Sequence, residues 1–307
     1  MDDQLIEIEE QTAEKRGNRF SAASIVLAAL ILAFAWVYIV GLKTNQFQKA
    51  TGNIKSAGEQ SENDVSQAVE LPVAWGNLGA QMVAAGVIDR LQLEALYNRR
   101  GGLTGDEKQF LEEGNGKMIV TQENSGFILN LFWALGLSNK NEILEQGPMA
   151  DPRYGGDASQ FASTGGWTLA QGNTMDHYSR HSFVTLTPEQ QSIVERVSRN
   201  IYRSCCDNST YFPDCNHGMA MLGLLELLAS QGASENQMFE TALQMNSFWF
   251  PEQYATIALY LESQGQTFQT ADPKEILGKE YSSASGFARI AALVPQGKRQ
   301  GGDGCGI

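Results

Sequence analysis

Residues 217–231 read HGMAMLGLLELLASQ, a strongly apolar run that predicts a helix. Gly232 follows directly, and glycine often ends a helix because it adopts a left-handed backbone conformation without strain. The sequence on both sides of this run continues the helical pattern.

Three further helices are predicted around it. Upstream, residues 187–190 (TPEQ) supply an N-cap, a proline at the first helical position and a capping-box partner. The apolar residues that follow have helical spacing, and this predicted helix runs into Cys205. Downstream, Ser234 and Gln237 cap the next helix, and Pro251 begins another. Four successive helices with short connections predict an antiparallel bundle.

The loop before residue 217 carries an unusual concentration of soft ligands. It contains Cys205, Cys206 and Cys215, which are three of the four cysteines, and it leads into His217. Thiolate and imidazole are the side chains that best bind borderline and soft transition metals. Since one helix leads into the loop and the next helix leaves it, these side chains should meet at one end of a helical hairpin. We therefore predict a zinc or copper site formed by these four residues.

Two further histidines precede this loop. His177 and His181 are four residues apart and would share one face of a helix, as metal-binding pairs do. The window 177–217 thus contains all three histidines, and either of these two can complete or flank the coordination shell. The plainer alternative is a polar segment with hydrogen-bonded imidazoles. Cys305, in the glycine-rich tail, is a candidate mobile ligand.

The cysteines leave two other readings open. An exported domain meets oxidising conditions, where an even cysteine count usually indicates disulfides. A bridge between Cys206 and Cys215 would staple the loop, a bridge between Cys205 and Cys206 would be a strained vicinal one, and Cys305 could pair with any of them. The third reading is thiol–disulfide exchange with exported partners.

The amino-terminal region predicts a membrane anchor. Residues 21–42 contain no charged side chain, and 22 helical residues at about 1.5 Å each can cross a hydrocarbon core of roughly 30 Å. A cluster of Lys15, Arg16 and Arg19 precedes them, which favours a cytoplasmic amino terminus. We expect a single-pass protein of the cell membrane, anchored through residues 20–42, with its bulk extracytoplasmic. A cleaved signal peptide is the rival reading.

Composition and motifs narrow the function classes. A net charge of −13 and a pI near 4.7 argue against nucleic acid as a partner, because phosphate binding needs a basic surface. The acidic exterior should also repel anionic headgroups, so membrane contact is expected through the anchor alone. No hydrolase, zinc-protease, phosphate-loop or EF-hand motif is present, so the sequence assigns no catalytic residue and no protein partner.

Helical periodicity also dominates the first half of the exterior chain. Thr104 opens a capping box, and residues 127–137 (FILNLFWALGL) are too apolar for a surface helix. Alternating strand patterns are nearly absent, so we predict an all-α fold. The expected parts are a cytoplasmic tail (1–19), an anchor (20–42), a flexible tether (43–70), a helical subdomain (71–146), a glycine-rich connecting loop (147–180), a helical bundle with the Cys/His loop (181–295) and a flexible glycine-rich tail (296–307).

A resemblance covers residues 201–254. A helix, a cysteine loop, a second helix, the words QGASE (231–235), a third helix and FWFP (248–251) follow one another. This order resembles the three-helix thiol protein of cytochrome c maturation, and the resemblance implies reduction of apocytochrome cysteines before heme attachment. That family presents a C-x-x-C pair in this loop, whereas this chain has adjacent Cys205 and Cys206, then Cys215-x-His217.

Overall fold

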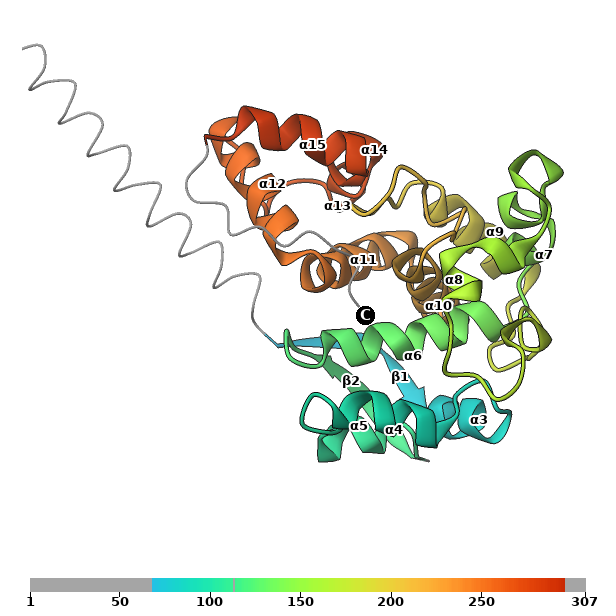
Figure 1. The fold of residues 1–307 in the computed structure, drawn as a ribbon. Helices are drawn as coiled ribbons and strands as arrows, with labels where there is room; N and C mark the ends of the chain where they lie inside the picture. The colour runs from blue at the N-terminus through green and yellow to red at the C-terminus, as the bar shows by residue number, and fades with distance from the viewer. Residues whose placement is uncertain (1–67, 113, 296–307) are drawn as a thin grey trace, which may run out of the picture. The chain divides into compact units, whose positions relative to one another are not determined.

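The structure is a computed structural model that describes residues 68–112 and 114–295, all within one compact unit. The described chain is mostly helical, as predicted (Figure 1). Its α-helices are α3 (Leu78–Ala84), α4 (Arg90–Asn98), α5 (Gly105–Gln109), α6 (Ser125–Ser138), α7 (Glu142–Gln146), α8 (Ala162–Gly165), α9 (Pro188–Ser198), α10 (Asn216–Ser230), α11 (Glu235–Trp249), α12 (Pro251–Ser263), α13 (Pro273–Ile276), α14 (Lys279–Ser282) and α15 (Ala284–Leu293). Short 3-10 helices are η1 (Pro148–Ala150), η2 (Pro152–Tyr154), η3 (Ala158–Gln160) and η4 (Thr174–Asp176).

The expected anchor at residues 20–42 and the tail with Cys305 lie outside the described residues. Within residues 68–112 and 114–295, every helix is too short or too polar to qualify as a membrane span. The last residues of the predicted tether, from Val69 on, already belong to a strand.

A small antiparallel sheet is the feature that the all-α prediction misses. Strand β1 (Val69–Gly76) pairs with β2 (Asn115–Val120), with Val69 opposite Val120 and Gly76 opposite Asn115. Along β1, alternate side chains are buried, as in a strand with one face on the core. The sheet lies between α6 and the short helices α3, α4 and α5 (Figure 1).

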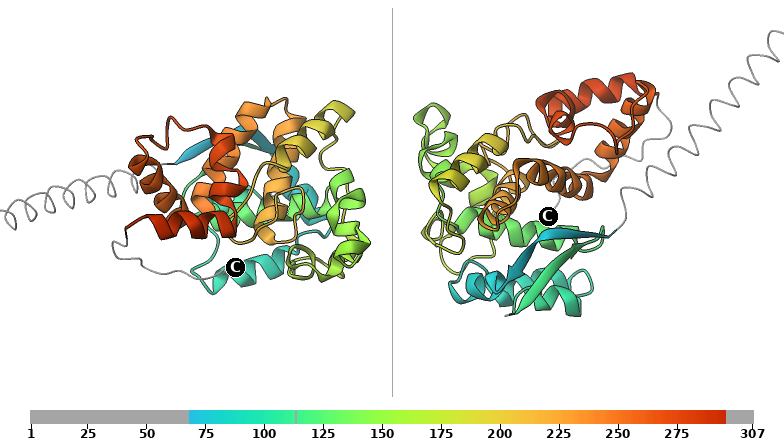
Figure 2. Two further views of the ribbon diagram at one scale, coloured as in Figure 1. Left: turned by 90° about the horizontal axis from the view of Figure 1, so that it is seen from above. Right: turned by 180° about the vertical axis from the view of Figure 1, so that it is seen from behind.

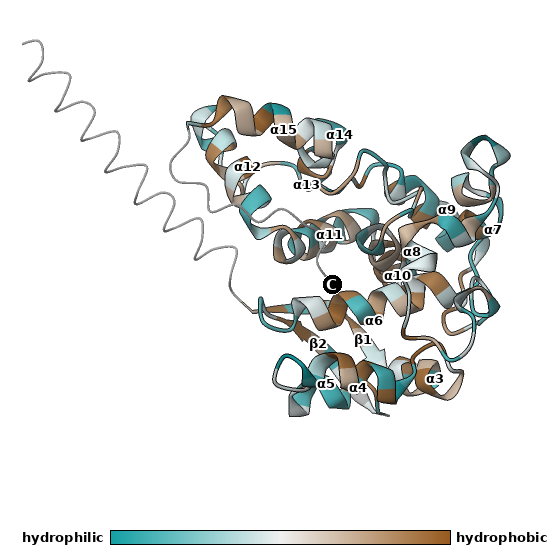
Figure 3. Ribbon diagram, viewed as in Figure 1, coloured by the Kyte–Doolittle hydropathy of each residue, from teal (hydrophilic) through white to brown (hydrophobic). Residues whose placement is uncertain are grey.

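Helices α6 and α10 form the centre of the core. Residues 127–138 of α6 are all buried, and so are residues 217–229 of α10, which confirms both predicted apolar helices. Figure 3 shows the apolar residues along these two helices. Gly136 and Gly223 lie where the helices cross, and a Cβ built on either would collide with backbone atoms of the other helix. The two backbones therefore pack in direct contact.

The predicted helix starts are confirmed. Thr104, Thr187 and Ser234 each form a capping box, and Pro251 is the first residue of α12. Helices α12, α14 and α15 pack together at one end of the unit (Figure 2).

The helix before the cysteine loop ends earlier than predicted. Helix α9 stops at Ser198, so Cys205 stands in a loop. Beyond α9 the backbone forms hydrogen bonds outside the helix. The Tyr202 N–H donates to the Leu277 carbonyl, and the Thr210 N–H donates to the Ile201 carbonyl. These bonds replace the i to i−4 pattern that a continued helix would need.

A fully buried carboxylate lies on α10. Glu226 is 0% exposed, and the side-chain amides of Asn139 and Asn141 donate to its two oxygens. Both asparagines are held in this orientation, because their carbonyl oxygens accept the Val184 and Ile143 backbone N–H groups. Burial raises the pKa of Glu226 well above its ordinary value, although the two amide donors oppose the shift.

We predict that Glu226 makes the stability depend on pH. Because the pKa of Glu226 is raised in the folded state, the protonated side chain stabilises the fold fully at pH values below the unfolded-state pKa. This stabilisation is lost as pH rises through the folded-state pKa. Each tenfold difference in proton affinity between the two states corresponds to about 1.4 kcal/mol of stability. The Glu226→Gln variant cannot titrate at this position, so wild type should lose stability relative to it as pH rises above the ordinary pKa of a carboxyl group. Urea unfolding of both proteins measures the difference, and parallel pH profiles would contradict this assignment.

Candidate metal centre

The cysteine loop is tied to three parts of the fold. The Tyr211 N–H donates to the Ser198 carbonyl at the end of α9, and the Ala284 N–H donates to the Cys206 carbonyl. The Asp214 carbonyl accepts from the Ser163 N–H in α8. Helix α10 then begins, with Cys215 as its N-cap and His217 as its second residue. The loop is therefore positioned by elements on several sides.

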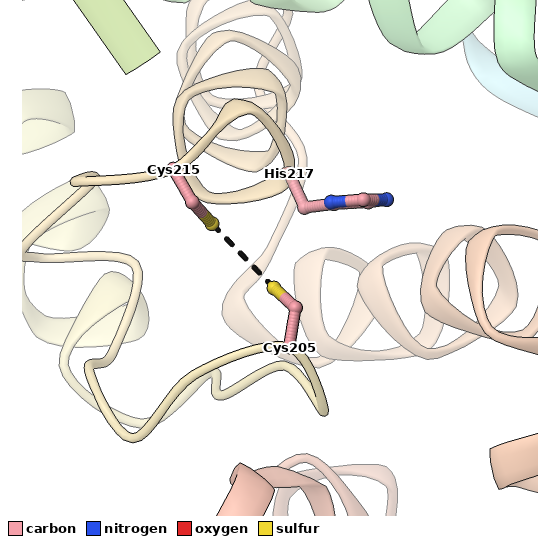
Figure 4. Close-up of side chains that lie close together, drawn as sticks. All are labelled: Cys205, Cys215 and His217. Atoms are coloured by element: carbon pink, nitrogen blue, oxygen red, sulfur yellow. Dashed lines mark hydrogen bonds between the residues drawn. The ribbon is translucent and has the colours of Figure 1, made fainter. Parts of the chain in front are cut away.

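Three predicted ligands come together at this point. The sulfur atoms of Cys205 and Cys215 are 3.6 Å apart, and a ring nitrogen of His217 lies within 4.8 Å of both. Figure 4 shows the two cysteines pointing toward each other from facing segments, with the His217 ring extending beside them. His217 is buried, whereas both cysteines are partly exposed. The structure thus brings three of the six predicted ligands together, and this group could hold a metal ion.

Cys206 belongs to a second group. Its sulfur, a carboxylate oxygen of Asp214 and the Cys215 sulfur all lie within 4.8 Å of one another. Cys215 is thus common to both groups: Cys205 and His217 complete the first, and Cys206 and Asp214 complete the second. None of the three cysteines described is in a disulfide.

A buried arginine organises the loop. Arg203 is 1% exposed, and its Nε donates to the Cys215 sulfur at 3.0 Å. The other guanidinium nitrogens donate to the carbonyls of Asn208 and Phe212 and, at 2.6 Å, to the Asp214 carboxylate. Asn208 also donates its side-chain amide to Asp214 at 2.8 Å. One cation therefore fixes both the loop backbone and two donor side chains.

Gly218 makes room for this arginine. A Cβ at Gly218 would lie 2.5 Å from the Arg203 Cζ atom and 2.8 Å from its Nε. The guanidinium therefore lies directly against the first turn of α10. Any other residue at this position would push Arg203 away from Cys215.

The neighbours of Cys215 favour its thiolate form. Hydrogen bonding from Cys205 and Cys206, and then the charge of Arg203, hold the pKa of Cys215 well below that of an ordinary thiol. Its place at the N-cap of α10 adds the positive end of the helix dipole. For Cys206, hydrogen bonding with Cys205 lowers the pKa, but the hydrogen bond with Cys215 and burial outweigh it and raise the pKa to about 11. Negative charge therefore collects on Cys215.

This centre is the feature from which the function has to be inferred. No known protein family, curated protein or solved structure matches the chain. The inference therefore depends on the donor atoms and on their surroundings.

His177 and His181 lie elsewhere. They follow η4 in a turn rather than on a helix, and Ser179 between them has a left-handed backbone. His177 Nδ1 is 3.1 Å from His181 Nε2, and His177 Nε2 is 3.0 Å from the Gln171 carbonyl. The segment pairs with Asn139, just beyond the carboxyl end of α6. The structure brings neither histidine into the donor groups of the cysteine loop.

Asp214 and Arg203 are the residues that sequence reasoning did not select. Asp214 lies beside Cys215 in the chain, and a carboxylate next to a cysteine in a ligand-rich loop is a usable signal. Arg203 carries no such signal, because an arginine two residues before Cys205 is indistinguishable from a surface residue until its burial is known.

We predict that Arg203→Lys weakens the centre. A lysine keeps the charge but loses the planar fork that reaches Cys215, Asp214 and the loop carbonyls together. Loss of a group that hydrogen-bonds to a metal ligand typically lowers metal affinity about 10- to 100-fold. Chelator competition measures the affinity, with circular dichroism as a check of folding. Arg196→Lys, on the exposed face of α9, is the matched control, and equal affinities in the two variants would refute the role of Arg203.

Proposed function

We propose that this chain binds a transition-metal ion, zinc or copper(I), through Cys205, Cys215 and His217. The observation that carries the proposal is the mutual approach of these three donor atoms within 4.8 Å. Two thiolates on one tetrahedral zinc, each at about 2.3 Å, are separated by roughly 3.7 Å. The 3.6 Å between the Cys205 and Cys215 sulfurs is close to that value. Metal could therefore bind with little movement of the loop.

Charge and softness support the same proposal. The N–H of Arg203 points at the Cys215 sulfur, and such donors commonly orient and stabilise the thiolate ligands of metals. Two thiolates and an imidazole suit zinc in tetrahedral geometry and copper(I) at lower coordination numbers. Calcium and magnesium are disfavoured, because they prefer oxygen donors.

The test is a metal titration of the reduced full-length chain. Zn(II) and Cu(I) are each added in competition with a chromophoric chelator, and the stoichiometry is read at saturation. We expect one equivalent of one of the two ions per chain. If neither ion is taken from the chelator, the proposal is wrong.

A second candidate function is thiol–disulfide exchange, which the resemblance of residues 201–254 also suggests. Cys215 as a thiolate would attack a disulfide of an exported partner and release one partner thiolate. Cys205, 3.6 Å away, would then displace the second, leaving a Cys205–Cys215 disulfide and a reduced partner. The Cys205→Ser variant should trap the mixed disulfide on Cys215. Absence of any trapped adduct with a model disulfide substrate would exclude this function.

We further propose that residues 20–42 anchor the domain to the cell membrane with the amino terminus in the cytoplasm and the metal centre outside. The uncharged stretch in the sequence supports this arrangement. Protease accessibility in intact cells tests it: the domain should be digested from outside, and a protected domain would reverse the orientation.

A further inference from the structure

The two cysteines of the proposed metal centre are also placed to form a disulfide. The sulfur atoms of Cys205 and Cys215 are 3.6 Å apart, which is about 1.5 Å longer than the S–S bond of a disulfide. Figure 4 shows the two side chains pointing toward each other. Neither cysteine is in a disulfide, and both are partly exposed, so a small oxidant can reach them. Each sulfur would have to move by less than about 1 Å to close the bond.

The third cysteine of the loop is directed toward oxygen atoms. The Cys206 sulfur lies 3.9 Å from the Asn208 carbonyl oxygen and 4.0 Å from a carboxylate oxygen of Asp214. Its pKa of about 11 keeps this thiol protonated at neutral pH, and a protonated thiol is a poor nucleophile. A bridge from Cys206 to Cys205 would be strained, because adjacent Cα atoms are about 3.8 Å apart and disulfides usually span at least about 4.4 Å. Cys215 is therefore expected to pair with Cys205.

A disulfide between these two residues would disable both donor groups. Cys215 is common to the group with Cys205 and His217 and to the group with Cys206 and Asp214. A sulfur atom in a disulfide is a poor metal ligand, since the thiolate is the form that binds metals. After oxidation the first group would retain only the His217 imidazole, and the second would retain only Cys206 and Asp214. Tetrahedral zinc sites use three or four protein ligands, so neither remainder would hold such an ion.

The contacts that hold the loop do not require the reduced state. Arg203 donates to the carbonyls of Asn208 and Phe212 and to the Asp214 carboxylate, and none of these groups takes part in the oxidation. The buried guanidinium would lose the charge of Cys215 but keep the carboxylate as its counter-charge. The loop can therefore pass between the two redox states while its surroundings stay in place.

We infer that this centre is a redox switch, in which reduced Cys205 and Cys215 bind the metal ion and their oxidation to a disulfide releases it. This inference rests on the proposed metal binding and concerns the regulation of that same site. The oxidant it requires is a low-molecular-weight disulfide, which belongs to the oxidising surroundings that an exported domain meets.

The oxidation proceeds in two exchange steps. The Cys215 thiolate attacks one sulfur of the small disulfide, whose S–S bond breaks and releases one small thiolate. The Cys205 thiol loses its proton to solvent, attacks the Cys215 sulfur of the mixed disulfide and displaces the second small thiolate. The two cysteines together lose two electrons, and the small disulfide gains them. The metal ion is neither oxidised nor reduced, and it passes to solvent or to a competing ligand.

The experiment treats the reduced, metal-loaded full-length chain with oxidised glutathione. The chain carries one equivalent of Zn(II), or of Cu(I) if the metal titration selects copper. A chromophoric chelator reports release of the ion, while thiol counting and intact mass report oxidation. All proteins carry Cys305→Ser, because Cys305 lies outside the described residues and would add a fourth thiol. Cys205→Ser and Cys206→Ser are the matched variants, since the two cysteines are adjacent in the chain.

We expect oxidation to remove two thiols per chain and to release the ion. The oxidised chain should bind the ion at least about 1000-fold more weakly than the reduced chain, and dithiothreitol should restore the affinity. In metal-free protein, Cys206→Ser should form its disulfide within about twofold of the parent rate, whereas Cys205→Ser should stop at the mixed disulfide with glutathione.

Three results would overturn the switch while leaving the proposed metal binding intact. These are equal metal affinities of the oxidised and reduced chains, an internal disulfide that still forms in Cys205→Ser, and a chain that oxidised glutathione leaves fully reduced. If the reduced chain binds neither Zn(II) nor Cu(I), the metal proposal itself fails and this inference fails with it.

Discussion

Replacing Cys215 by serine is expected to lower the affinity for the metal ion about 100- to 1000-fold. Cys215 belongs to both donor groups, and it is the thiol whose pKa its neighbours lower most clearly. Structural zinc binding of about 10–16 kcal/mol, shared among four ligands, assigns roughly 2.5–4 kcal/mol to each, which is about a 100- to 1000-fold loss of affinity. Chelator competition on reduced protein measures this loss.

Two further variants give the prediction its specificity. Cys206→Ser should lose less affinity than Cys215→Ser, because Cys206 lies in the group that lacks Cys205 and His217. His181→Ala should leave the affinity unchanged, since its ring contacts His177 and Phe183 rather than the cysteines. Equal losses in Cys206→Ser and Cys215→Ser would place the ion in the other group, with Asp214 as a ligand.

The ligand cluster could be predicted because its members are close in sequence. The loop that joins α9 to α10 keeps its two ends close together, so Cys205, Cys215 and His217 could not lie far apart. His177 and His181 had no such constraint, and their rings interact with each other and with a backbone carbonyl. Residues within one loop could therefore be predicted to meet, whereas the position of the two histidines, which a longer connection separates from that loop, could not be predicted.

The helices were predictable for a similar reason. Capping boxes at Thr104, Thr187 and Ser234 are local, and the structure contains each of them. Strand β1 was missed, although Leu71, Val73 and Trp75 alternate toward the core. Pro72 interrupts the pattern, and the partner strand begins only at Asn115, so no short turn marks a hairpin.

The role of Arg203 could not be obtained from sequence at all. Its position depends on the loop carbonyls of Asn208 and Phe212 turning inward and on Gly218 leaving space. Each of these conditions is a property of the folded loop. A buried arginine of this kind is recognised only when all of its partners are placed.

A methyl group at Gly136 should destabilise the whole fold. The Cβ of Gly136→Ala would collide with the Met219 carbonyl oxygen and lie 2.8 Å from the Gly223 nitrogen. These are backbone atoms of α10, so relief requires the two central helices to move apart. Overpacking of this kind costs about 3 kcal/mol, which lowers the melting temperature by roughly 6–12 °C. Gly126→Ala in the same helix, where a Cβ meets nothing within 4 Å, should change stability by less than about 1 kcal/mol.

The same separation of α6 and α10 should also change the geometry of the metal centre. Helix α10 carries His217 at its start, whereas Cys205 is held by the loop, so moving α10 away from α6 changes the distance between these two donors. We therefore expect Gly136→Ala to weaken metal binding as well as to lower the melting temperature. Gly223→Ala should act alike, because its Cβ would meet the Phe132 carbonyl of α6. The double variant should lose less stability than the sum of the two, since a single separation of the helices relieves both collisions. Additive losses would show that the two glycines do not share one contact.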